Sequence, residues 1–276
     1  MKRFEDLTFA DHYMFEKVLQ NAEICKELLE RLLKIQIERL EYPELEKTIS
    51  PYYESRGVRL DVYVKGSGEV FDIELQNSAD LLPLRTRYYQ SMLDADNLIK
   101  GGHYSELPRS FIIFICTIDP FGAGRPVYTF RSRCDEDTAL LLEDRTVRKF
   151  FNTTAWQRET DMAIKSLLEY TCNKRPVDDL TKRIDSLVGS IKKKETNRKE
   201  YSTLNIHDQD TFRRGKSEGL MEAKLETARN LLLKDIPSGV IAECTALPLE
   251  VVEQLRQEIL ATETQHATES PSPRRS

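Results

Sequence analysis

The sequence predicts an α/β protein, with a mixed core over residues 1–158 followed by an all-helical region over residues 159–260. Two changes of period predict this class. Apolar residues recur at helical spacing near the N-terminus, alternate with polar residues from Val58, and return to helical spacing from about Asp161. Residues 261–276 are rich in serine, threonine and proline without apolar periodicity, so we expect a disordered tail there.

The clearest element of the predicted core is a β-hairpin. Residues 58–65 and 71–76 each alternate between apolar and polar side chains, which is typical of half-buried strands. Gly66, Ser67 and Gly68 separate the two runs and supply a tight turn.

The other elements follow from similar local signals. Asp11 stands where an N-terminal helix would begin, and Pro43 ends that helical region. Pro83 precedes a helical stretch that Gly101 and Gly102 end. Further strands are predicted at residues 110–118, which are nearly all apolar and typical of a strand buried on both faces, and at residues 126–132 and 138–143.

Composition and charge exclude several classes of protein. The 276 residues carry 41 lysines and arginines against 46 aspartates and glutamates, so bulk basicity gives no argument for nucleic-acid binding. No apolar run approaches the ~20 residues of a membrane helix, and the first residues lack the apolar stretch of a signal peptide. The 5 cysteines are scattered without a CxxC pair, which disfavours a disulfide framework or a zinc site. We therefore expect a reduced, cytoplasmic protein without a membrane partner.

The polar face of the hairpin carries the candidate chemistry. A two-residue turn at Ser67 and Gly68 places Asp61 opposite Glu74, and such cross-strand neighbours have Cβ atoms about 4.5–5.5 Å apart. Like charges at that separation are destabilising, whereas a divalent cation between them reverses the sign of the interaction. Hard oxygen ligands of this kind suit Mg²⁺, with Mn²⁺ as an alternative.

Residues beside Glu74 extend this face. Gln76 lies two positions further on and points to the same side, while the backbone carbonyl of Leu75 could reach a cation held by Glu74. Asp72 belongs to the same polar set, but it lies nearer the turn and we expect it at the surface.

At this point the residues resemble a known family. The stretch FDIELQNSADLLPLRTRYYQSMLDADNLIKGGHYSELPRSFIIFIC, with DHYMFEKVL near the N-terminus, is similar to the PD-(D/E)xK nuclease superfamily. Within it, the sequence resembles the Rpn-type recombination-promoting nucleases, a transposase-like family, over residues 8–260. The resemblance implies a restriction-endonuclease-like core, in which helices flank a mixed central sheet. It also implies a metal-dependent DNA endonuclease linked to DNA recombination or to a mobile element.

The resemblance implies roles for individual residues. Asp61 and Glu74 would hold Mg²⁺, and Gln76 stands where the superfamily has a lysine that positions and activates water. Because Gln76 is neutral, it can orient a water or a phosphate oxygen but adds no positive charge. Arg85 in the following helix could supply that charge. Leu60 replaces the proline that often precedes the aspartate.

Two groups of residues are candidates for contact with DNA. Tyr88 and Tyr89 lie in the helix after the hairpin, where we expect at least one of them to be buried. Lys192, Lys193 and Lys194 lie in a basic helical segment that could contact the phosphate backbone, or could be a solvated helical face.

Alternatives to the nuclease interpretation stay open from the sequence. Asp61 and Glu74 could be solvated carboxylates that pair with Arg59 or Lys65, and Arg85 could form a structural salt bridge. The chain would then be a catalytically weak or inactive, transposase-derived DNA-binding or interaction protein. A small-molecule enzyme has less support, because neither a GxGxxG motif nor a P-loop is present.

The remaining motifs are given no catalytic role. The 4 histidines show no ligand spacing, and Glu16 on the first helix is a weak candidate for approaching the metal. Residues 238–259 predict two short helices joined at residues 246–248, but the second is too acidic to read a DNA groove. We expect this region to serve packing or self-association, for example in a homodimer.

Overall fold

A mixed sheet of six strands organises the N-terminal part of the computed structural model. The structure describes the backbone of residues 2–41, 43–50 and 57–268, and the side chains of the same residues apart from 205–214 and 260–268. The strand order is β1-β2-β3-β4-β6-β5, in which β3, β4 and β6 run parallel and the other neighbours pair antiparallel. The strands are β1 (Glu44–Ile49), β2 (Val58–Gly66), β3 (Glu69–Gln76), β4 (Arg109–Cys116), β5 (Val127–Phe130) and β6 (Thr146–Asn152).

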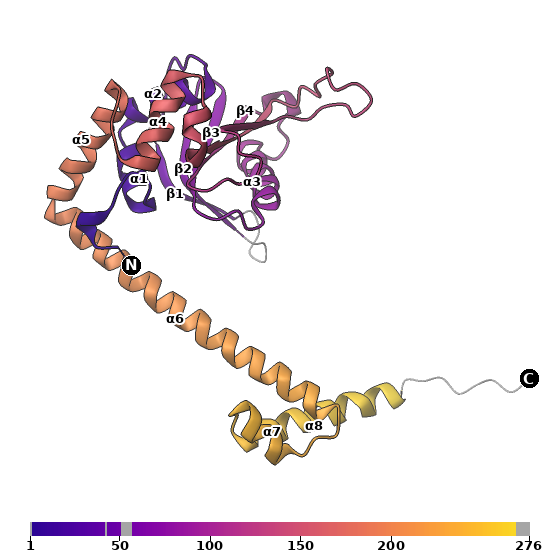
Figure 1. Cartoon of the computed structure of the whole chain (residues 1–276). Coiled ribbons are helices and arrows are strands. Elements are labelled where there is room, and N and C mark those ends of the chain that lie inside the picture. The colour runs from indigo at the N-terminus through magenta and orange to yellow at the C-terminus, as the bar shows by residue number, and fades with distance from the viewer. Residues whose placement is uncertain (1, 42, 51–56, 269–276) are drawn as a thin grey trace, which may run out of the picture. The chain divides into compact units, whose positions relative to one another are not determined.

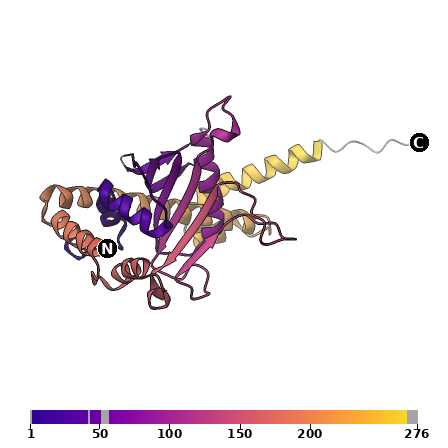
Figure 2. The ribbon, with the colours of Figure 1, turned by 90° about the horizontal axis from the view of Figure 1, so that it is seen from above.

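Helices lie on both faces of this sheet (Figure 1). One face forms an apolar core with four helices, and α3 covers the other face. Figure 2 shows the strands side by side in one twisted sheet, with the N-terminal helices along one side. The helices of this unit are α1 (His12–Leu19), α2 (Ala22–Leu33), α4 (Met162–Asn173) and α5 (Asp179–Lys193) on the first face, α3 (Leu82–Asn97) on the second, and the short 3-10 helices at Phe4–Asp6, Tyr104–Glu106 and Thr153–Arg158. This arrangement confirms the predicted α/β class, a mixed sheet flanked by helices.

The hairpin between β2 and β3 forms in the predicted register. Tyr63 pairs with Asp72, as a two-residue turn requires. The turn residues Ser67 and Gly68 have φ of 47° and 80°, the pair of left-handed conformations that defines a type I′ turn. The turn therefore fixes which side chains of the two strands lie opposite each other.

The predicted strand at residues 138–143 is wrong. These residues form a loop with one isolated bridge, between Arg133 and Leu141. Leu140 and Leu142 supply the alternation that predicts a strand, but their exposed fractions are 58% and 70%, so no sheet buries them.

Two strands were not predicted, because neither carries a clean apolar pattern. β1, with the sequence ELEKTI, lies at the edge of the sheet and buries Ile49 alone among its side chains. β6, with the sequence TVRKFFN, lies between β4 and β5, although Arg148 and Lys149 interrupt its apolar residues. Both strands are placed by pairing with neighbouring strands rather than by their own apolar pattern.

The chain divides into two compact units, Met1–Tyr201 and Ser202–Ser276. The first unit continues past residue 158, where we expected the core to end. The reason is that α4 and α5 contribute to the same apolar core as α1 and α2, through side chains such as Leu167 and Ile184.

The second unit is helical, as predicted. It contains the later part of α6 (Glu195–Leu232), with α7 (Ser238–Thr245) and α8 (Leu249–Thr268), around a small apolar core. Ala246 ends α7 in a left-handed conformation with φ of 54°, which confirms the predicted break between two helices. α8 runs beyond residue 261, where we expected a tail, and residues 269–276 lie outside the described residues. Among the described residues, no helix combines the length and apolar character needed to cross a membrane.

Candidate active site

The ladder between β2 and β3 is replaced by side-chain contacts near the end of β3. The last paired residues are Val62 and Ile73. Beyond them, the backbone N–H of Asp61 donates to Glu74 Oε1 at 3.0 Å. The backbone N–H of Leu75 donates to Asp61 Oδ2, also at 3.0 Å. Each carboxylate therefore accepts a hydrogen bond from the opposite strand, which holds both side chains in place.

An irregularity in β2 brings Asp61 to this position. Leu60 packs in the core on the α3 side of the sheet, whereas Val62 packs in the core on the opposite side. Residues two apart in a regular strand share a face, so the strand is distorted at Asp61. The Asp61 side chain stays partly exposed as a result, while Glu74 is 2% exposed.

Burial shifts the acidity of the carboxyl groups on this face. Burial and the charge of Asp61 raise the pKa of Glu74 to about 7. Asp72 is fully buried, and neither of its carboxyl oxygens has a hydrogen-bond partner among the described residues. Burial, together with the nearby Glu74, raises the pKa of Asp72 well above its usual range. The expected surface position of Asp72 is therefore wrong, because α3 covers the face to which it points.

These groups fit a hard divalent cation. Two carboxylates with no lysine between them suit Mg²⁺ or Mn²⁺, whose charge would offset their mutual repulsion. The Leu75 N–H faces Asp61, and the carbonyl of a strand residue lies on the same edge as its N–H, so this oxygen is available at the same place. No cluster of three or more His, Cys, Asp or Glu side chains with metal-binding geometry occurs within the described residues. A cation held by two carboxylates and one carbonyl would keep coordination positions for water and phosphate.

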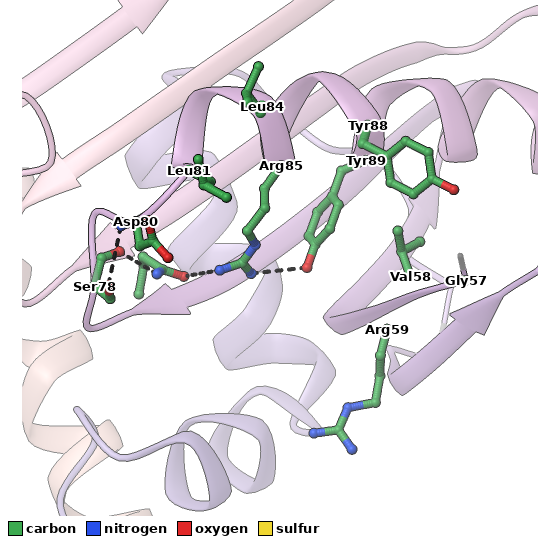
Figure 3. Close-up of a pocket in the computed structure, with 11 residues that line it drawn as sticks. Gly57, Val58, Arg59, Ser78, Asp80, Leu81, Leu84, Arg85, Tyr88 and Tyr89 are labelled. Carbon is green, nitrogen blue, oxygen red and sulfur yellow. Dashed lines mark hydrogen bonds between the residues drawn. The ribbon is translucent and has the colours of Figure 1, made fainter. Parts of the chain in front are cut away.

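A chain of hydrogen bonds leads from the end of β3 to α3. The Gln76 side-chain amide donates to the Ser78 carbonyl. Arg85 donates from Nη1 to Gln76 Oε1 at 3.1 Å and from Nη2 to the Tyr89 hydroxyl at 3.0 Å. Arg85 Nη2 also lies 3.7 Å from Glu74 Oε2. The guanidinium is therefore held beside the carboxylates by contacts on both sides, and Figure 3 shows it turned toward the hydroxyl of Tyr89.

The carboxylates and this chain of hydrogen bonds line one open cavity of about 360 Å³. The cavity lies at the carboxyl end of β3, the edge where ligands commonly bind to parallel sheets. Asp61, Glu74, Leu75, Gln76 and Arg85 all contribute to its lining. The structure thus brings together the five residues that the sequence analysis proposes as catalytic or metal-binding.

A comparison with known families agrees with this geometry. The model of the PD-(D/E)XK nuclease family transposases matches residues 3–154. The chain belongs to this family. Comparisons with curated proteins and with solved structures gave no match. The matched range contains the whole hairpin and α3, so the cavity lies inside the PD-(D/E)XK domain. The resemblance to this superfamily and to its transposase-like members is thereby confirmed.

Two residues that sequence reasoning set aside lie close to Asp61: His12, which lines the cavity, and Glu16, which interacts with the charge of Asp61. His12 Nδ1 lies 3.3 Å from Asp61 Oδ2, and this contact raises the pKa of the imidazole. Burial and the charge of Asp61 raise the pKa of Glu16 to about 8. The two residues are one helical turn apart in α1. This i, i+4 spacing is the sequence signal that could have placed both side chains on the same face of the helix. Neither residue is near the hairpin in sequence, so no local pattern connects them to it.

The predicted DNA-contact residues have different positions relative to the cavity. Tyr89 is 8% exposed and lines the cavity, whereas Tyr88 is 36% exposed and points away from the core. The prediction that at least one of the two tyrosines is buried is therefore confirmed. Lys192 lines a separate small cavity beside α4, and Lys193 and Lys194 lie exposed at the end of α5. The structure does not bring the three lysines to the carboxylates.

Proposed function

We propose that this protein is a divalent-metal-dependent DNA endonuclease that hydrolyses phosphodiester bonds in DNA recombination or in the movement of a mobile element. The observation that carries the proposal is a pair of hydrogen bonds across neighbouring strands, in which the Glu74 carboxylate accepts from the Asp61 N–H and the Asp61 carboxylate accepts from the Leu75 N–H. Two carboxylates held this close, one of them nearly buried, gain most from a cation between them. Membership of a nuclease family supports the same reaction class.

In this proposal Asp61, Glu74 and the Leu75 carbonyl hold Mg²⁺, with Mn²⁺ as a substitute. The cation, when bound, supplies Lewis-acid chemistry at the phosphate and lowers the pKa of a bound water. Gln76 orients a water or a phosphate oxygen through its amide, and its contact with Arg85 fixes that orientation. Arg85 supplies the positive charge that the neutral Gln76 does not, and its planar fork suits a phosphate.

We further propose DNA as the partner and a role in DNA contact for residues other than the metal ligands, Gln76 and Arg85. Tyr88 and Tyr89 lie beside Arg85 on α3 and would contact the nucleotide next to the cleaved bond. Lys192, Lys193 and Lys194 would contact phosphates further along the DNA, which predicts a binding affinity that falls with added salt. The helical unit that begins at Ser202 would support a homodimer, which suits cleavage of both strands.

A plasmid-nicking assay with conservative variants tests the function. Asp61→Asn and Glu74→Gln remove a metal-binding charge while keeping an oxygen that can accept the backbone hydrogen bond. We expect both variants to lose nicking in Mg²⁺, while Asp135→Asn, a change at an exposed loop carboxylate, nicks like the wild type. Full activity in Asp61→Asn or Glu74→Gln would refute the proposed site.

One observation favours a second candidate, an interaction protein without nuclease activity. The Gln76 amide nitrogen donates to the Ser78 carbonyl, and the amide oxygen accepts from Arg85. The side chain at the position of the superfamily's lysine is therefore neutral, and both of its polar atoms already make hydrogen bonds within the protein. If the wild type binds DNA in a salt-sensitive manner but cleaves nothing in Mg²⁺ or Mn²⁺, this second function holds and the first fails.

A further inference from the structure

A second, larger cavity adjoins the carboxylates. It has a volume of about 760 Å³ and shares five lining residues with the carboxylate cavity: Arg59, Gln76, Ser78, Arg85 and Tyr89. The start of β2 lies on one side of it and the first turns of α3 on the other, as Figure 3 shows. A group that enters this cavity therefore lies directly beside whatever the carboxylates bind.

The wall that α3 contributes is apolar and exposed. The exposed fractions are 62% for Leu81, 53% for Leu84 and 36% for Tyr88. Leu84 and Tyr88 are four positions apart and share one face of α3, and Leu81 at the N-cap lines the same cavity. Exposed leucines next to a tyrosine at the mouth of a cavity are unusual on a surface that meets only water, and they suit a flat apolar partner.

The rest of the cavity is polar, with two cationic side chains and one carboxylate, that of Asp80 on the loop before α3. Arg59 is exposed at the start of β2, and Arg85 lies between the two cavities. The carboxamide of Gln76 and the loop residue Ser78 also contribute to the lining. An apolar wall, hydrogen-bonding groups and two guanidinium groups together match the parts of a nucleotide, which are a flat base, its polar edge and its phosphate.

We propose that this cavity receives an unpaired nucleobase next to the phosphate at the carboxylates, so that the protein acts on DNA with unpaired nucleotides rather than on a fully paired duplex. In a duplex, each base face is stacked on its neighbours and each pairing edge is occupied. A base can reach the wall formed by Leu81, Leu84 and Tyr88 only if it is already unpaired or is extruded from the stack. This inference rests on the proposed nuclease function, because that function places the phosphate.

The test compares binding of single-stranded and blunt duplex DNA of the same sequence by the full-length protein. Fluorescence anisotropy of a labelled oligonucleotide is measured with Ca²⁺ in place of Mg²⁺, and a gel of the same samples reports any cleavage. We expect the wild type to bind the single strand more tightly. Tyr88→Ala should weaken single-strand binding by about tenfold, because it removes the ring on which a base stacks, and should change duplex binding little.

Two further variants separate the base contact from folding. Leu81 has a left-handed backbone with φ of 50°, so Leu81→Gly relieves strain and should not destabilise the protein, yet it removes part of the apolar wall. Its single-strand affinity should therefore fall while its melting temperature is kept or raised. Tyr104→Ala is the control, since Tyr104 is an exposed tyrosine that does not line the cavity.

The outcomes distinguish this inference from the proposed function. Equal affinity for both DNA forms, or unchanged single-strand affinity in Tyr88→Ala and Leu81→Gly, would overturn the base site even if the protein nicks plasmids in Mg²⁺. A single-strand preference that depends on Tyr88 and Leu81 would support the base site even if the wild type nicks no plasmid in Mg²⁺ or Mn²⁺, and in that case the nuclease proposal fails alone.

Discussion

The backbone N–H of Asp61 donates to Glu74 Oε1 at 3.0 Å, where a regular β-ladder would place a carbonyl oxygen. In return, Asp61 Oδ2 accepts the N–H of Leu75 from the other strand. The two carboxylates therefore have a structural role as well as the proposed metal-binding role, and substitutions can separate these roles.

Asp61→Asn should remove activity with little effect on folding, whereas Asp61→Ala should affect both. The alanine variant leaves the Leu75 N–H without its acceptor, and an unsatisfied buried donor costs about 1–3 kcal/mol. Urea unfolding of the two variants measures this difference, and plasmid nicking measures the activity. Equal stability of the two variants would show that the hydrogen bond contributes nothing.

Asp72→Asn should stabilise the protein. The carboxyl group is fully buried next to the Glu74 carboxyl and accepts no hydrogen bond from a donor among the described residues, so it must be protonated or carry an uncompensated charge at neutral pH. An amide of the same shape is neutral at every pH, so it needs neither protonation nor a buried charge. We expect the free energy of unfolding to rise by roughly 1–3 kcal/mol at pH 7. Urea denaturation checks the value. A loss of stability would mean that the carboxyl group makes a favourable contact that an amide cannot replace.

Glu16→Gln should weaken the pH dependence of stability in the metal-free protein. Because the pKa of Glu16 rises from 4.5 to about 8 on folding, the folded state binds more protons than the unfolded state between these values. The contribution of Glu16 to stability is complete below pH 4.5 and is lost as the pH rises through 8. Unfolding measured from pH 5 to pH 8.5 with a chelator should therefore show a shallower decline for the variant.

The exposed Glu23 on α2 provides the control for that experiment. Glu23→Gln should decline with pH as steeply as the wild type. If Glu16→Gln and the wild type also decline with the same slope, the raised pKa of Glu16 is contradicted.

Arg85→Lys should lower the nicking rate by about tenfold to a hundredfold, although it keeps the positive charge. The planar guanidinium reaches Gln76 and Tyr89 at once, and an ammonium group cannot hold both contacts in that geometry. Arg87→Lys, an exposed change on the same helix, is the matched control. A rate for Arg85→Lys equal to that of Arg87→Lys would remove Arg85 from the proposed mechanism.

The hairpin could be predicted from the sequence because its information is local. The turn at Ser67 and Gly68 sets the register, so Asp61 lies across from Glu74, although the distortion of β2 at Asp61 replaces the regular pairing with a side-chain hydrogen bond. The alternation of residues 58–65 and 71–76 does not report what covers each face. Asp72 has the pattern of a surface residue, yet α3 buries it completely.

Contacts between distant segments could not be predicted in the same way. His12 reaches Asp61 because α1 packs near the start of β2, and no spacing along the chain encodes that approach. β6 is likewise a strand because β4 and β5 pair with it on either side, while its own sequence contains two basic residues. The residues that complete the cavity are thus set by tertiary packing rather than by a motif.

The most direct test of the central claim is plasmid nicking by the wild-type protein across a metal series. With a chelator the account predicts no nicking, and with Mg²⁺ or Mn²⁺ it predicts conversion of supercoiled to nicked plasmid, which Asp61→Asn and Glu74→Gln abolish. Supercoiled plasmid that stays intact in both metals, or nicking that persists in the chelator or in the two variants, would contradict it.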